Sequence, residues 1–256
     1  MSKPHSIKIV RHGESEGNVN RQIYAKVPDY ALRLTPNGLL QARMCGQRLR
    51  QQLDGDVMFY VSPQFRARDT HFEIAKFFPG SPVREEPLIR EQDWGSNLRE
   101  VDAIADWEKE REQYGAFYFR FHRGESGCDV YDRVSDFIGV MHRDFERSDY
   151  PKNAIIVTHG FTARVLLMRW LHLSVEQFEL LSNPPNCGTY SLRLGADDHY
   201  VIAEPPPQYH QVKHGWRWSP PVSPKLPKIT DKMDRKLEFM EFGGSVPLVE
   251  RNPQRL

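Results

Sequence analysis

An arginine and a histidine stand together at the end of the first apolar stretch, in the run Arg11-His12-Gly13. The four residues before them, 7–10, are mostly apolar and β-branched, which predicts a buried strand. A strand that ends there delivers both side chains to the mouth of a sheet, where α/β folds bind their ligands. A guanidinium offers fixed donors to phosphate oxygens, and a neutral imidazole can attack phosphorus. The pair suggests phosphoryl transfer, although an Arg-His pair after a strand is more often structural.

Three further side chains fall where other predicted strands end. Arg66 lies in the first turn of a helix that we expect to begin at Ser62-Pro63, with Ser62 as its cap. Glu91 follows a short predicted strand, and His159 follows the apolar run at 154–157. The carboxyl ends of parallel strands meet at one edge of a sheet, so we expect these side chains to share a rim with the first pair. Two arginines and one histidine would neutralise phosphoryl oxygens there, while the other histidine attacks and the carboxylate handles the leaving-group proton.

Strands and helices alternate along most of the chain. Apolar runs at residues 7–10, 57–61 and 154–157 predict buried strands, and apolar residues at helical spacing predict helices, as over 127–147. This alternation predicts an α/β fold, a three-layer sandwich with a mostly parallel sheet and helices on both faces. Residues 190–203 predict a closing hairpin.

The composition divides the chain into a domain, residues 1–204, and a C-terminal extension, residues 205–256. Within the domain, residues 96–126 contain a charged helix over 101–113, followed by an aromatic and basic run at 114–123. This insertion could be a lid over the site, or a segment that packs its aromatic residues on the edge of the sheet. The extension is rich in proline and mildly basic. Its aromatic residues predict that it docks on the domain, and a protein partner could also bind it in polyproline form.

The composition excludes several classes of function. The formal net charge is +1, so the chain lacks the positive surplus of a general nucleic-acid or membrane-surface binder. No apolar run approaches a membrane span or a signal region, and three widely spaced cysteines indicate reduced thiols, so we expect a cytoplasmic protein. The one histidine pair at HxxxH spacing, His210 and His214, lies in the proline-rich extension, so we expect no metal and no cofactor.

Short motifs along residues 6–204 resemble those of the histidine phosphatase superfamily, in their order. They are Arg11-His12-Gly13-Glu14-Ser15 with Asn18, Leu34-Thr35-Pro36-Asn37-Gly38, Ser62-Pro63 with Arg66 and Thr70, Leu88 with Glu91 and Gly95, Gly124-Glu125-Ser126, and Val157-Thr158-His159-Gly160. Two segments look most like a phosphoglycerate-mutase-like branch of plant and fungal broad-range phosphatases, namely Glu91-Gln92-Asp93-Trp94-Gly95 and Asp129-Val130-Tyr131-Asp132-Arg133. The resemblance implies a phosphoglycerate-mutase-like fold.

The resemblance also implies a role for each residue of the predicted rim. His12 would be the nucleophile and form a phosphohistidine, while Arg11, Arg66 and His159 would bind the phosphoryl group. Glu91 would protonate the leaving oxygen and then activate water. Arginines would supply the positive charge that Mg²⁺ supplies elsewhere, so the resemblance implies a metal-independent hydrolase of phosphomonoesters.

The loop at residues 19–33 and the insertion after Gly95 should shape the substrate site. We expect substrate contacts from Asn18, which the resemblance implies as an assistant at the phosphoryl group, and from Arg21, Tyr24 and Arg99. The substrate could be a small-molecule phosphomonoester, such as a sugar phosphate or a nucleotide, or a phosphopeptide.

Two other functions compete with hydrolysis. A phosphoglycerate-type phosphomutase returns the phosphoryl group to another oxygen of the same molecule, which usually demands extra basic residues around a second anionic group. Arg99, Arg120 and Arg123 could serve, but the resemblance to true mutases weakens after Gly95. A catalytically weak phospho-ligand-binding protein on the same fold should lack at least one of the five predicted catalytic residues, and all five are present.

Overall fold

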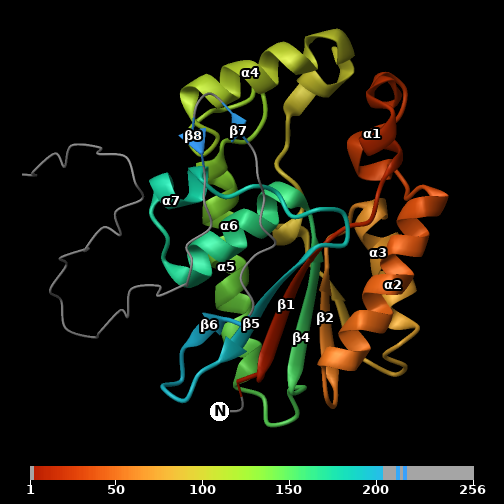
Figure 1. Ribbon diagram of the computed structural model, residues 1–256, viewed down its shortest axis with the longest axis vertical. Coiled ribbons are helices and arrows are strands. Elements are labelled where there is room, and N and C mark those ends of the chain that lie inside the picture. The colour runs from red at the N-terminus through yellow and green to blue at the C-terminus, as the bar shows by residue number, and fades with distance from the viewer. Residues whose placement is uncertain (1–2, 204–211, 214–215, 218–256) are drawn as a thin grey trace, which may run out of the picture. The chain divides into compact units, whose positions relative to one another are not determined.

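The computed structural model describes residues 3–203, 212–213 and 216–217 (Figure 1). The chain divides into two compact units, Met1–Pro220 and Pro221–Leu256, and the second lies outside the described residues. The described part of the extension consists of two short antiparallel strands, β7 (Val212–Lys213) and β8 (Trp216–Arg217). The expectations that the extension docks on the domain or binds a partner therefore stay predictions.

A sheet of six strands forms the middle layer. β3, β2, β4 and β1 are parallel, β5 pairs antiparallel with β1, and β6 pairs antiparallel with β5. The order across the sheet is β3 (Val83–Glu85), β2 (Val57–Val61), β4 (Asn153–Thr158), β1 (Ser6–Arg11), β5 (Thr189–Leu194) and β6 (Tyr200–Ile202). The predictions of a mostly parallel sheet and of a closing hairpin are confirmed.

Helices cover both faces of this sheet, as Figure 1 shows. One pair packs against each face: α2 (Pro36–Gln52) with α3 (Phe65–Ala75), and α5 (Gly127–Phe145) with α6 (Gly160–Leu171). Successive strand side chains point to opposite faces, so neighbouring residues feed two separate cores. Phe59 packs in the cluster with Ala42 of α2, and Tyr60 packs in the cluster with Phe137 of α5. The predicted three-layer architecture is confirmed.

One predicted helix start is confirmed and another is wrong. Thr35 accepts a hydrogen bond from the backbone N–H of Gly38 at 3.0 Å, which starts α2 as predicted. The predicted start of α3 is wrong. That helix begins at Phe65, and the Oγ of Ser62 is hydrogen-bonded to Nε2 of His159 at 2.7 Å instead of capping the helix.

The segment between β3 and α5 winds through several short helical turns. The strand predicted over 83–89 ends at Glu85, and the elements that follow are η3 (Pro87–Ile89), η4 (Gly95–Arg99), η5 (Val101–Ala103) and α4 (Ile104–Tyr114). Phe117, Phe119 and Phe121 are buried, so the aromatic run packs inward, while Ile104 and Glu108 of α4 line a cavity at the carboxyl ends of the strands. The aromatic run therefore packs inward and α4 contributes to the wall of the cavity, while a lid function of the insertion stays a prediction.

Four further elements complete the described domain: α1 (Glu16–Val19), η1 (Arg21–Ala25), η2 (Asp29–Ala31) and α7 (Val175–Glu179). The first three belong to the long loop after β1. In the part of the chain that the structure describes, no helix combines the length and the apolar character that a membrane crossing requires.

Candidate active site

Parallel pairing of β1 with β4 brings the two predicted histidines together. Arg11 lies opposite Thr158 at the last position of the ladder, so His12 and His159 both follow directly at the carboxyl edge. Their ring centroids are 5.2 Å apart. The His12 side chain is buried, with 4% of its surface exposed, and His159 is fully buried. Two sequence-distant residues therefore meet because one strand register aligns them.

A single hydrogen bond fixes the tautomer of the His12 ring. Its Nδ1 lies 2.7 Å from the backbone carbonyl oxygen of Gly13, and a carbonyl can only accept, so Nδ1 carries the proton. Burial lowers the pKa of His12 well below 6.5, and the charges of Arg66 and Arg11 lower it further. The ring is neutral at pH 7, and its Nε2 bears the lone pair that a nucleophile needs.

One ring nitrogen of His159 bonds to Ser62, the residue after β2, and the other has no partner within the described residues. Burial lowers its pKa well below 6.5, and the charge of Arg66 adds to this effect. Its Nε2 bonds to Ser62, while its Nδ1 is buried and has no hydrogen-bond partner within the described residues. An unsatisfied buried polar atom costs free energy, so a ligand oxygen at Nδ1 would stabilise the site.

Arg66 enters the site from the first turn of α3. Its guanidinium donates to the backbone carbonyl of Asp29 at 2.7 Å and to the Asp29 carboxylate at 3.1 Å. The side-chain amide of Gln64 donates to the same carboxylate at 2.6 Å. Burial alone would lower the pKa of Arg66, but the charge and hydrogen bond of Asp29, together with Tyr24 and Glu91, outweigh burial and raise it. Asp29 belongs to a loop without periodic patterning, so no sequence signal predicts its contact with Arg66.

Arg11 and Asn18 are fixed by the loop before β5. Arg11 donates to the carbonyl of Pro184 at 2.6 Å. Asn186 donates through one amide nitrogen to the Asn18 side-chain oxygen at 3.1 Å and to the backbone carbonyl of His12 at 3.2 Å. The loop thus ties the end of β1 to α1, and it places Asn18 beside the histidine.

The carboxylate of Glu91 lies at the N-terminus of α6. It accepts hydrogen bonds from the backbone N–H groups of Phe161 at 3.2 Å and Thr162 at 3.1 Å, and from the Thr162 hydroxyl at 3.1 Å. The backbone N–H of Glu91 donates to the side chain of Gln64 at 2.9 Å. Exposed N–H groups at a helix start favour a negative charge, so α6 orients this carboxylate.

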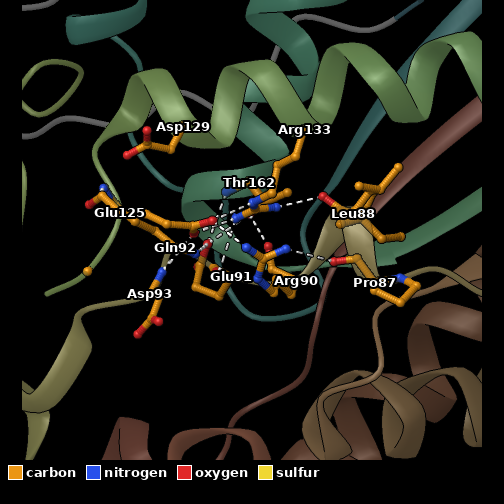
Figure 2. Close-up of polar contacts among 12 residues, drawn as sticks. Pro87, Leu88, Arg90, Glu91, Gln92, Asp93, Glu125, Asp129, Arg133 and Thr162 are labelled. Carbon is orange, nitrogen blue, oxygen red and sulfur yellow. Dashed lines mark hydrogen bonds and ion pairs between the residues drawn. The ribbon is translucent and has the colours of Figure 1, made fainter.

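A buried ion pair anchors the main chain around Glu91, as Figure 2 shows. Arg133 of α5 donates to both carboxylate oxygens of Glu125 at 3.0 Å, to the carbonyl of Leu88 at 2.6 Å and to the carbonyl of Glu91 at 3.2 Å. The Glu125 carboxylate also accepts from the backbone N–H of Asp93 at 3.0 Å. Glu125 and Arg133 both lie in segments that resemble the family, but the sequence predicted no role for either residue.

Most of the predicted residues line a single cavity of about 260 Å³. They are Arg11, His12, Asn18, Arg21, Tyr24, Arg66 and Glu91. His159 does not line it and reaches the site through its contact with His12. Arg99 is exposed and does not line it either. Five further residues line the cavity without a role predicted from the sequence, namely Asp29, Trp94, Leu98, Ile104 and Glu108.

Positive charge in the cavity comes from three arginines, and two of them face acidic partners. Arg21 makes a two-pronged ion pair with Glu108 of α4, at 2.9 and 3.0 Å. Arg66 is paired with Asp29. Across residues 3–203, no group of three or more histidine, cysteine, aspartate or glutamate side chains gathers closely enough to hold a metal ion.

The chain is similar in sequence to known proteins over most of its length. The chain is 42% identical to phosphoglycerate mutase-like protein AT74 of Arabidopsis thaliana over 78% of this chain and 68% of that protein. It is 28% identical to broad-range acid phosphatase DET1 of Saccharomyces cerevisiae, over 78% of this chain and 89% of that protein.

Solved structures show the same fold. A mycobacterial glucosyl-3-phosphoglycerate phosphatase superposes with a TM-score of 0.63 at 22% identity, covering 78% of this chain and 98% of that one. The family model of the histidine phosphatase superfamily (branch 1) matches residues 7–203. The resemblance found in the sequence is confirmed, and the chain belongs to the histidine phosphatase superfamily.

Proposed function

We propose that this phosphatase hydrolyses small-molecule phosphomonoesters through a phosphohistidine on His12, without a metal ion. The observation that carries the proposal is the state of His12 in the cavity. Its Nδ1–H is held by the carbonyl of Gly13, and its buried ring is neutral. Nucleophilic attack by Nε2 then needs no prior deprotonation.

In the first step, Nε2 of His12 attacks phosphorus, the bond to the leaving oxygen breaks, and Glu91 donates its proton to that oxygen. Arg11 and Arg66 supply the positive charge at the phosphoryl oxygens. Asp29 accepts from two of the five N–H donors of Arg66, which leaves donors of this cavity-lining guanidinium for the phosphoryl oxygens. His159 adds the ring nitrogen that lacks a partner.

In the second step, water attacks the phosphohistidine on the opposite side of phosphorus from the histidine. The Glu91 carboxylate takes a proton from the water, the P–N bond breaks, and inorganic phosphate leaves with His12 neutral again. The same carboxyl group thus acts once as acid and once as base.

The arginines that line the cavity support hydrolysis rather than phosphomutase chemistry. A mutase must hold a second anionic group, and Arg99, Arg120 and Arg123 were the candidates for that role. None of the three lines the cavity, and Arg120 is paired with Asp129. The name of the yeast relative, a broad-range acid phosphatase, also supports hydrolysis. We further propose a cytoplasmic location, which the free thiols of Cys45, Cys128 and Cys187 support.

Trapping of the intermediate tests the proposal. A ³²P-labelled phosphomonoester should transfer an acid-labile, base-stable label to the protein, and His12→Ala should abolish both the label and turnover. His122→Ala is the matched control, because His122 is exposed and lies outside the cavity lining. Normal turnover by His12→Ala would overturn the assignment of the nucleophile.

A further inference from the structure

The cavity has a second wall that phosphoryl transfer does not use. Trp94, Leu98 and Ile104 line it from the segment that runs from Glu91 into α4, and Tyr24 lines it from η1. η1 contacts both η4 and η5, so the two loops close over the same space. Figure 1 shows α4 and its preceding turns at the end of the sheet where β1 and β4 finish.

The Trp94 ring of this wall is packed against other side chains. The Trp94 ring stacks on Phe121 with centroids 4.3 Å apart and planes 17° apart, and Phe121 is fully buried. The guanidinium of Arg111 lies 5.8 Å from the Trp94 ring centroid and 4.6 Å from that of Phe161. A ring fixed in this way binds another ring at little entropic cost.

The charges of the wall disfavour a second anion. Once the phosphoryl group has taken Arg11 and Arg66, the remaining lining cation is Arg21, which Glu108 already neutralises. Even without the carboxyl group of Glu91, the lining sets only three arginines against the carboxylates of Asp29 and Glu108, so a bound phosphoryl dianion gives the cavity a net negative charge. A carboxylate or second phosphate on the leaving group would enter this negative cavity with no further lining cation to pair with it, and such like-charge contacts lower affinity.

We infer that the preferred substrates are phosphomonoesters of aromatic or apolar alcohols whose leaving group carries no second negative charge. The inference rests on the proposed function, because it assigns the leaving-group side of the same site. Trp94 and Tyr24 provide the aromatic surface, Leu98 and Ile104 the apolar surface, and Glu108 the discrimination against anions.

A matched set of esters tests it. Benzyl phosphate, 4-carboxybenzyl phosphate and 4-(aminomethyl)benzyl phosphate share one type of leaving oxygen and differ in distal charge, and ethyl phosphate lacks the ring. We expect kcat/KM for benzyl phosphate to exceed that for 4-carboxybenzyl phosphate and that for ethyl phosphate, each by about tenfold or more. The aminomethyl ester should match or exceed benzyl phosphate.

Two variants assign the preference to the wall. Glu108→Gln releases Arg21 and should raise the carboxybenzyl-to-benzyl ratio of kcat/KM by about threefold, whereas Glu110→Gln, on an exposed position of α4, should leave it unchanged. Trp94→Ala should lower the benzyl-to-ethyl ratio by about fivefold. Tyr114→Ala, also on α4 and 70% exposed, is its control.

The outcomes separate the two proposals. Equal or faster hydrolysis of the carboxybenzyl ester by the wild-type protein would overturn the inference and leave the proposed function standing. Ratios that do not move in Glu108→Gln and Trp94→Ala would also overturn it. If the protein hydrolyses none of the four esters, the proposed function is overturned, and the inference with it.

Discussion

Arg133 offers a test of how the fold positions Glu91, the proposed general acid. The side chain is buried, with 7% exposed, and its guanidinium donates to Glu125 and to the carbonyls of Leu88 and Glu91. Arg133→Met keeps the volume but leaves the Glu125 carboxylate without its main partner. Breaking one side of a buried pair costs about 3–5 kcal/mol. Arg90 still pairs with Glu125, so we expect the lower end, about 3 kcal/mol.

This loss corresponds to a fall in Tm of roughly 6–12 °C for a domain of this size. The same change frees the main chain of Glu91, so proton donation to the leaving oxygen should suffer. We expect kcat for an alkyl phosphate to fall by about tenfold, and kcat for 4-nitrophenyl phosphate, whose leaving group needs little protonation, by less than about threefold.

Thermal unfolding and steady-state kinetics at a temperature well below both transitions measure the two effects separately. Arg147→Met is the control, because Arg147 pairs with Asp149 on the surface, where water screens the pair and it adds little to stability. The double variant Glu125→Gln/Arg133→Met should recover part of the lost stability, since no buried charge is left unpaired. Equal losses of kcat for both substrates would refute a positioning role.

Two further predictions concern stability. The pKa values of buried His12 and His159 lie well below 6.5. Below pH 6.5 the unfolded chain therefore binds more protons than the native state, and stability falls as the pH falls. Between pH 6.5 and 5.5 urea titrations should show a loss of about 1 kcal/mol per histidine. In the second prediction, a Cβ at Gly38 would overlap the backbone oxygen of Glu14, so Gly38→Ala should cost about 2–3 kcal/mol, whereas Gly139→Ala, with no neighbour nearer than 3.6 Å, should gain about 0.5–1 kcal/mol in calorimetry.

The sequence predicts the strand ends well because a local signal marks them. Apolar, β-branched runs identify β1, β2 and β4, and the rule for parallel sheets then brings Arg11, His12 and His159 to one edge without knowledge of any contact. The position of Glu91 after β3 is predicted in the same way. The places of these four residues follow from the order of the strands, and the hydrophobic pattern of the sequence predicts those strands.

The ion pairs of the cavity depend instead on the path of loops. Arg66 meets Asp29 across 37 positions, and Arg21 meets Glu108 across 87. Neither loop has a period, so no spacing rule connects the partners. Ser62 misled for a different reason: a serine before a proline has the pattern of a helix cap, but α3 begins only at Phe65, and the Ser62 hydroxyl bonds to His159.

The proposed catalytic residues and the proposed substrate wall therefore lie in different parts of the chain, and different interactions stabilise the two parts. The histidines extend from a sheet with a full ladder of hydrogen bonds, and Arg133 anchors Glu91 from a core helix. The wall formed by η1 and α4 is joined partly by the Arg21–Glu108 pair, whose side chains are 54% and 38% exposed and whose contribution is at most about 1 kcal/mol. Substitutions in that wall can change the accepted leaving group at small cost in stability. We expect variants selected for new substrates to change there and to keep the pocket around His12.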